Sequence, residues 1–208
     1  MTITDDIFAQ LSGAPMQQIS QQLGLGQTQT AGAIAAALPM LIGALGRNAS
    51  QPQGAEALFG ALQRDHAGGG MGLGDVLGAV LGGQQSRQTD GAGMLGHIFG
   101  SRQPQAEQAI GQATGLGSDK ANTLLKVLAP LVLAYLAKRF FDNRQAGAAQ
   151  QSASPQVLGD LLGQERRQIS QQGGLGGGLL GAVLDRDGDG DVDIGDIFKA
   201  GMGMMGRR

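Results

Sequence analysis

The sequence predicts an all-α protein in which two related three-helix units form a helical bundle. Three observations lead to this prediction. Apolar residues recur at three- and four-residue spacing, glycine and proline stand where helices end and begin, and one pattern of residues occurs twice in the chain. The 208 residues suit one or two globular domains. Since 41% of them are hydrophobic and only 3% aromatic, the core must be built mainly from Leu, Ala, Ile, Val and Met.

The repeated pattern aligns without a gap, residues 19–47 on residues 110–138. The identical pairs are Ile19 and Ile110, Gln21 and Gln112, Gly24 and Gly115, Leu25 and Leu116, Gly26 and Gly117, Pro39 and Pro130, and Leu45 and Leu136. Such self-similarity indicates a duplicated structural unit. We therefore expect the two halves to superpose helix for helix.

The first helix of each unit is predicted to end at Gly24 or Gly115, because glycine readily adopts the left-handed conformation that closes a helix. The second helix is predicted to begin near Thr28 or Ser118, whose hydroxyl groups can cap free backbone amides. Its apolar face in the second unit comprises Leu124, Leu125, Leu128, Leu131, Val132 and Tyr135.

Proline marks two further features of each unit. Pro39 and Pro130 lie inside the second helices, where each removes one backbone hydrogen bond and is expected to bend the helix. Pro52 and Pro155 stand where the third helices are predicted to begin, since proline is well suited to the first turn of a helix.

These elements divide the chain into four parts. They are a first helical unit at residues 1–63, a glycine-rich connector at 64–103, a second helical unit at 104–165, and a C-terminal segment at 166–208 that carries an acidic loop. The apolar sequence at residues 76–81 of the connector recurs almost unchanged at residues 179–184, just before that loop.

Glycine recurs at every fourth residue of the connector, at Gly70, Gly74, Gly78 and Gly82. A helix with this spacing has one bare backbone edge, which lets another helix approach closely. The alternative is a linker with one marginal helix, because each glycine lowers helix stability by ~1 kcal/mol.

The most specific motif is the acidic loop at residues 185–196, which resembles the twelve-residue calcium loop of EF-hands. Asp185, Asp187 and Asp189 occupy positions one, three and five, where carboxylates deliver oxygen ligands to Ca²⁺ from one side. Gly190 occupies the sixth position, where the chain must turn sharply.

The remaining positions of the loop complete the resemblance. Asp191 is expected to offer its main-chain carbonyl, and Asp193 to act through a water molecule. Asp196 stands at the twelfth position instead of Glu, so the following helix must lie closer for both oxygens to bind the ion. This shorter closing ligand resembles dockerin loops. Without a second such loop to pair with, we expect an affinity between millimolar and micromolar.

The charge distribution favours a bound cation at this loop. Its twelve residues contain six Asp and one Arg, whereas Lys199, Arg207 and Arg208 follow it. So many carboxylates within one turn repel one another unless a metal, protons or the basic residues neutralise them. The alternative is a solvated acidic turn without a metal, or one paired only with those basic residues.

Several functional classes are excluded or disfavoured. The absence of cysteine excludes disulfides, Cys-ligated zinc, iron–sulfur clusters and thiol nucleophiles. A formal net charge of -2 argues against nucleic-acid binding, which needs clustered Lys and Arg. No catalytic motif accompanies the two histidines, His66 and His97, so the protein is not expected to be an enzyme.

The N-terminal residues do not resemble a secretory signal, so we expect a cytoplasmic protein, with unconventional export left open. The longest uncharged apolar stretches, residues 31–46 and 127–137, are shorter than the ~20 residues of a membrane-spanning helix, and each contains a proline. They are predicted to be buried core helices.

The segment around Gly24, Pro39 and Pro52 resembles the YidB-like bacterial proteins, a domain of unknown function. Members often end in an Asp-rich loop like the one at residues 185–196. The resemblance implies a small all-helical fold and supplies no catalytic residues.

We therefore expect a non-enzymatic binding or assembly module with a single Ca²⁺ site. Its partner is expected to be a protein or a second copy of the chain. Two alternatives stay open. One is an enzyme with an unrecognised pocket between the helical units. The other is a membrane-surface or secreted structural protein.

Overall fold

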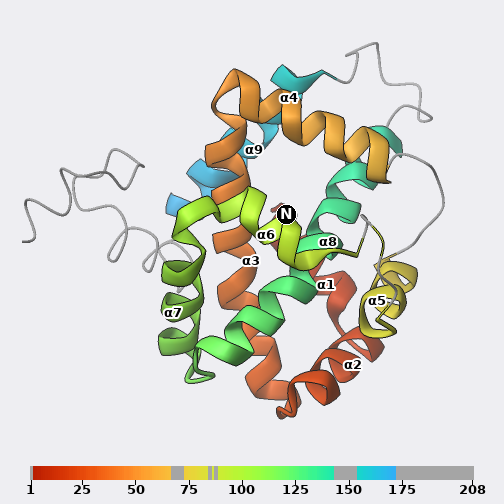
Figure 1. Ribbon diagram of the computed structural model, residues 1–208, viewed down its shortest axis with the longest axis vertical. Coiled ribbons are helices and arrows are strands. Elements are labelled where there is room, and N and C mark those ends of the chain that lie inside the picture. The colour runs from red at the N-terminus through yellow and green to blue at the C-terminus, as the bar shows by residue number, and fades with distance from the viewer. Residues whose placement is uncertain (1, 67–72, 84–85, 87–88, 143–153, 172–208) are drawn as a thin grey trace, which may run out of the picture.

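The computed structural model describes residues 2–66, 73–83, 86, 89–142 and 154–171 (Figure 1). These residues form α-helices joined by short turns, and none of them lies in a strand. The predicted all-α class is confirmed. The helices are α1 (Ile3–Leu11), α2 (Ala14–Leu23), α3 (Gln27–Ala49), α4 (Pro52–Ala61), α5 (Leu73–Leu81), α6 (Gly91–Phe99), α7 (Gln103–Thr114), α8 (Ser118–Asp142) and α9 (Pro155–Gln171), with a π-helical segment η1 (Leu62–His66) and a 3-10 turn η2 (Gly100–Arg102).

The two longest described helices, α3 and α8, pass through the middle of the protein and contact each other (Figure 1). The apolar face predicted for α8 is buried, Tyr135 included. By length and composition α3 could cross a membrane, since its best 18-residue window has a mean hydropathy of 1.4. However, 78% of that window is buried inside the protein, as is typical of a core helix.

Glycine and proline act where the sequence predicts. Gly24 and Gly115 follow α2 and α7 with φ angles of 60° and 69°, which confirms the left-handed helix ends. Pro52 and Pro155 are the first residues of α4 and α9, as expected. The predicted hydroxyl cap at Thr28 is wrong, because α3 already begins after a glycine and has no side-chain cap.

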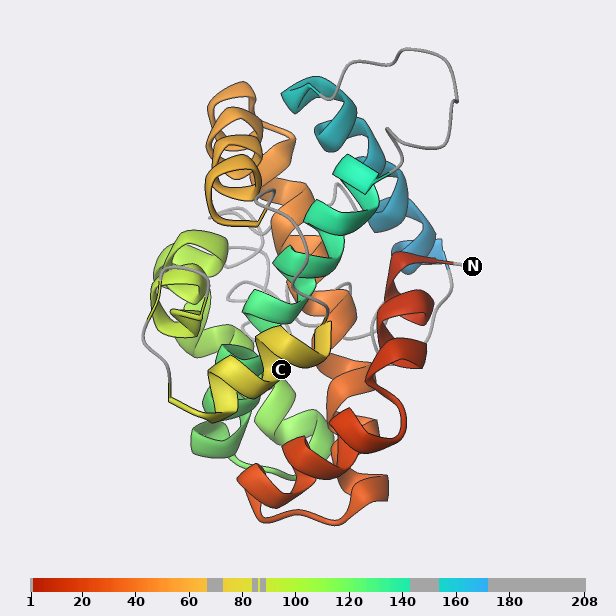
Figure 2. The same ribbon diagram turned by 90° about the vertical axis from the view of Figure 1, so that its right-hand side faces the viewer.

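The third helical segment of each half reaches the central helix of the other half. In the second half α9 packs along α3, whereas η1, the continuation of α4, packs on α8. Figure 2 shows α4 and α9 at the same end of the protein, where they also contact each other. The two halves are therefore intertwined.

One further helix precedes the three predicted helices of each half, α1 in the first half and α6 in the second. The pair Ile7 and Phe8 in α1 lies 91 residues before Ile98 and Phe99 in α6, which is also the separation between Gly24 and Gly115. Moreover, α1 packs on α2 and α3, just as α6 packs on α7 and α8. The repeat therefore includes α1 and α6.

The range predicted as a glycine-rich connector contains α5 and α6. In α5, Val76 and Leu77 are buried, while Gly74 and Gly78 are exposed with no atom near the position of an added Cβ. The bare edge predicted from the glycine spacing thus faces outward at these two positions, and the opposite side of α5 packs on α8.

Candidate functional site

The carboxylates predicted to bind Ca²⁺ lie outside the described residues. These are Asp185, Asp187, Asp189, Asp191, Asp193 and Asp196. Within the described ranges, which end at residue 171, no cluster of three or more His, Asp or Glu residues is placed to hold a metal ion. The calcium site stays a prediction, and the polar contacts described below are those of the helical body.

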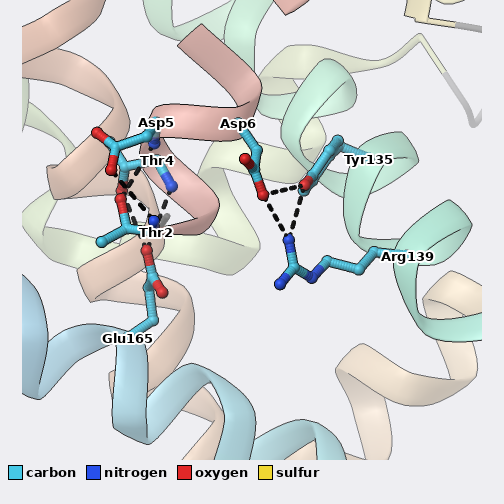
Figure 3. Close-up of polar contacts among 7 residues, drawn as sticks. All are labelled: Thr2, Thr4, Asp5, Asp6, Tyr135, Arg139 and Glu165. Atoms are coloured by element: carbon cyan, nitrogen blue, oxygen red, sulfur yellow. Dashed lines mark hydrogen bonds and ion pairs between the residues drawn. The ribbon is translucent and has the colours of Figure 1, made fainter. Parts of the chain in front are cut away.

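Three side chains join α1 to α8 (Figure 3). Arg139 donates from Nη1 to Asp6 Oδ2 over 2.6 Å and to the Tyr135 hydroxyl oxygen over 3.0 Å. The Tyr135 hydroxyl in turn donates to the same Asp6 oxygen over 3.1 Å. A single carboxylate oxygen therefore accepts two hydrogen bonds, one of them from a charged donor.

This arrangement stabilises the protonated forms of Tyr135 and Arg139. Burial raises the pKa of the Tyr135 phenol, and the hydrogen bond with Asp6 acts in the same direction. The hydrogen bond to Tyr135 raises the pKa of Arg139. At neutral pH Tyr135 is thus a hydroxyl donor and Arg139 a cation. The contact holds two helices together and supplies no activated nucleophile.

A second polar contact joins α1 to α9. Glu165, whose residue is 6% exposed, accepts from the Thr4 amide over 3.2 Å (Figure 3). Beside it, Thr2 and Asp5 form a capping box at the start of α1, in which each side chain accepts from the amide of the other residue. The hydrogen bond from the Thr2 amide holds the pKa of Asp5 below its usual value.

A third contact joins α3 to α6. Asn48 donates from Nδ2 to the carbonyl oxygens of His97 and Ile98, over 2.9 and 3.0 Å, at the end of α6. Asn48 and Arg139 lie 91 residues apart, and so do Asp6 and His97. Equivalent positions therefore bridge a central helix of one half to the first helix of the other twice. The acceptor is a carboxylate in one bridge and a pair of backbone carbonyls in the other.

The described residues also line a depression of about 740 Å³. Its lining comes from α5, α6 and α8 and the residues between α5 and α6: Val80, Gly83, Ser86, Thr89, Asp90, Gly91, Ala92, Thr123, Lys126 and Val127. The Asp90 carboxylate already accepts from the Gly93 amide as the N-cap of α6. Thr89 and Ser86 hydrogen-bond to each other. These groups serve the local backbone, and they do not form a nucleophile with an adjacent base.

A family model described as a bacterial protein of unknown function (DUF937) matches residues 5–139. The chain belongs to this family. The match runs from α1 into the last turn of α8 and contains both bridges between the halves. It leaves out α9 and the acidic loop. No curated protein and no solved structure matches the chain.

No sequence pattern predicts the bridging contacts, which are made by Asp6, Asn48, Arg139 and Glu165. One signal was available, because Tyr135 and Arg139 stand four residues apart and thus on one face of a helix. Their partner Asp6 is 129 residues from Tyr135, and no local pattern joins the two.

Proposed function

We propose that this DUF937 protein is a non-enzymatic binding or assembly module in which a helical body carries a single Ca²⁺ site at residues 185–196. The observation that carries the proposal is the loop itself. Asp185, Asp187 and Asp189 stand at the three carboxylate positions of a calcium loop, with Gly190 at its sharp turn. The YidB-like resemblance, which also includes such a loop, belongs to the same proposal.

The chemistry of the body supports a scaffold. Asp6, Tyr135 and Arg139 are engaged with one another, and Glu165 is engaged with α1. Glu107 of α7 accepts from Asn122 of α8, and also from Gln103 one turn earlier in α7. These polar groups hold the helices together and so have a structural role. Such a role suits a scaffold that positions a binding element.

Calorimetric titration of the full chain with Ca²⁺ tests the metal site. We expect heat from the wild type and none from Asp185→Ala with Asp189→Ala. The matched control is Asp119→Ala with Asp160→Ala, which removes two exposed carboxylates elsewhere and should titrate like the wild type. At ~100 times its dissociation constant Ca²⁺ should stabilise the segment by ~2.7 kcal/mol. Equal heats from all three proteins would show that the loop is a solvated acidic turn.

Light scattering tests the assembly part of the proposal. The exposed glycine edge of α5 would let another helix approach closely, so Gly74→Leu with Gly78→Leu should lower the mass of a self-associated wild type. A monomer in both forms, with and without Ca²⁺, would contradict self-association and leave binding of another protein as the assembly function.

A further inference from the structure

We propose that residues 176–184 form a second copy of α5 and dock on α3 and α7 of the same chain. This inference goes beyond the proposed function and does not depend on calcium binding. It assigns an intramolecular partner to a surface of α3 that the described residues leave exposed. Three independent observations carry it: the register of the repeat, the contacts of α5, and the direction of α9 along α3.

The register of the repeat continues from α4 and α9 into this segment. Pro52 and Pro155 lie 103 residues apart, and the same separation relates Leu58 to Leu161 and Gly60 to Gly163. Without any gap it then relates residues 76–81 to residues 179–184. The pairs are Val76 and Leu179, Leu77 and Leu180, Gly78 and Gly181, Ala79 and Ala182, Val80 and Val183, and Leu81 and Leu184.

The contacts of α5 show what this sequence does in the first half. Val76 and Leu77 are 2% and 1% exposed, because α5 packs on α8 and touches α2. Their counterparts Leu179 and Leu180 are equally apolar. A second α5 would bury them in the same way against the equivalents of α8 and α2, which are α3 and α7.

The direction of α9 leads the chain to that place. A Cβ added at Gly159 would approach the Ala49 carbonyl, and the Gly46 position faces the Leu162 carbonyl. Moving forward along α9 is therefore moving backward along α3, so the two helices are antiparallel. The chain leaves α9 towards the N-terminal half of α3.

The N-terminal half of α3 offers a surface of matching chemistry. Gly32 and Ala35 are exposed, and no atom lies within 4 Å of a Cβ added at Gly32. They lie 91 residues before Thr123 and Lys126, which line the depression beside Val80. Where α8 is polar beside α5, α3 is small and apolar, which suits close packing of an apolar helix that contains glycine.

Cross-linking between introduced cysteines tests the docking, since the chain has no cysteine of its own. The test pair is Ala35→Cys with Val183→Cys, treated with a short bis-maleimide in EDTA at low protein concentration. The positive control is the described pair Lys126→Cys with Val80→Cys. The negative control is Lys126→Cys with Val183→Cys. We expect an intramolecular cross-link, located by peptide mapping, in the test pair and the positive control only.

Two outcomes would overturn the proposal. One is a test pair that does not cross-link while the positive control does. The other is a cross-link that forms only between two chains, which would assign this surface of α3 to a second copy.

A further variant separates docking from chance encounter. Leu179→Asp with Leu180→Asp should reduce the yield of the test pair at least tenfold and leave the positive control unchanged. An unchanged yield in the test pair would mean that no apolar docking occurs. Because EDTA is present throughout, these results are independent of calcium binding.

Discussion

Two helix–helix joints lie at equivalent positions of the two halves, one between α3 and α9 and the other between α8 and α4. They differ in the side chains at the contact. At the first joint, glycines let backbone approach backbone, since a Cβ at Gly159 would lie 2.9 Å from the Ala49 carbonyl oxygen. At the second joint the counterpart of Ala49 is Phe140, 91 residues later. Its ring packs edge-on against Phe59 with centroids 6.0 Å apart.

The difference shows that the duplicated fold keeps an arrangement of helices while the side chains at each joint differ. Small residues allow backbone contact between α3 and α9, whereas the rings of Phe59, Phe140 and Phe141 pack against one another between α4 and α8.

The largest effect is expected from Gly159→Leu, which forces a side chain into the backbone of α3. Such overpacking costs about 3 kcal/mol of unfolding free energy. Gly163→Leu is the matched control, because it lies one turn later in α9 with no atom near its added Cβ. For Gly163→Leu, chemical denaturation should show an unfolding free energy within about 1 kcal/mol of the wild type, in either direction. Equal losses at both positions would refute the close joint.

An intermediate effect is expected at the aromatic joint. Phe140 is only partly buried, so Phe140→Ala should lower the unfolding free energy by about 1–2 kcal/mol, below the range of about 3–5 kcal/mol for a fully buried ring. Phe140→Leu keeps much of the volume and should lose less than half as much. If the two variants melt alike, the ring contacts with Phe59 contribute nothing to the joint.

The smallest effect concerns the charged bridge between α8 and α1. The raised pKa of Tyr135 means that the folded protein retains a proton that the unfolded chain releases above about pH 10. The contribution of protonated Tyr135 to the unfolding free energy is therefore complete below about pH 10 and declines as the pH rises through the pKa of the folded state. Tyr135→Phe should lose about 1 kcal/mol at pH 7 and flatten the alkaline decline. Thermal melts from pH 8 to 11 measure both, and an identical decline in the two proteins would contradict this role for Tyr135.

The parts of the fold that the sequence predicts are those set by neighbouring residues. Gly24, Gly115, Pro52 and Pro155 determine helix ends through their own backbone preferences, so their positions follow from local chemistry. Thr28 fails as a cap because α3 begins at Gln27 after Gly26, so Thr28 already lies inside the first turn. A hydroxyl group in the first turn is therefore weak evidence for a cap.

The pairing of helices was not predictable in the same way. Nothing in the order of residues says that α9 packs on α3, because the decisive quantity is how closely two backbones approach. The helices α1 and α6 share only the dipeptide Ile-Phe at equivalent positions, which is too short to identify a repeat by itself. The acidic loop at residues 185–196 lies outside the described residues, so its calcium site stays a prediction from sequence.

The hydrogen bond from the Thr4 amide to Glu165 spans 161 residues of chain, which has a consequence for synthesis on the ribosome. At ~5–20 residues per second, about ten to thirty seconds pass between the appearance of the donor and that of its acceptor. During that interval α1 can pack on α2 and α3, but α3 does not yet have α9 to cover it. The nascent N-terminal half must therefore wait, with apolar surface exposed, until the second half arrives to intertwine with it. A chaperone that recognises emerging apolar helices would find a long opportunity at the face of α3 that α9 later covers.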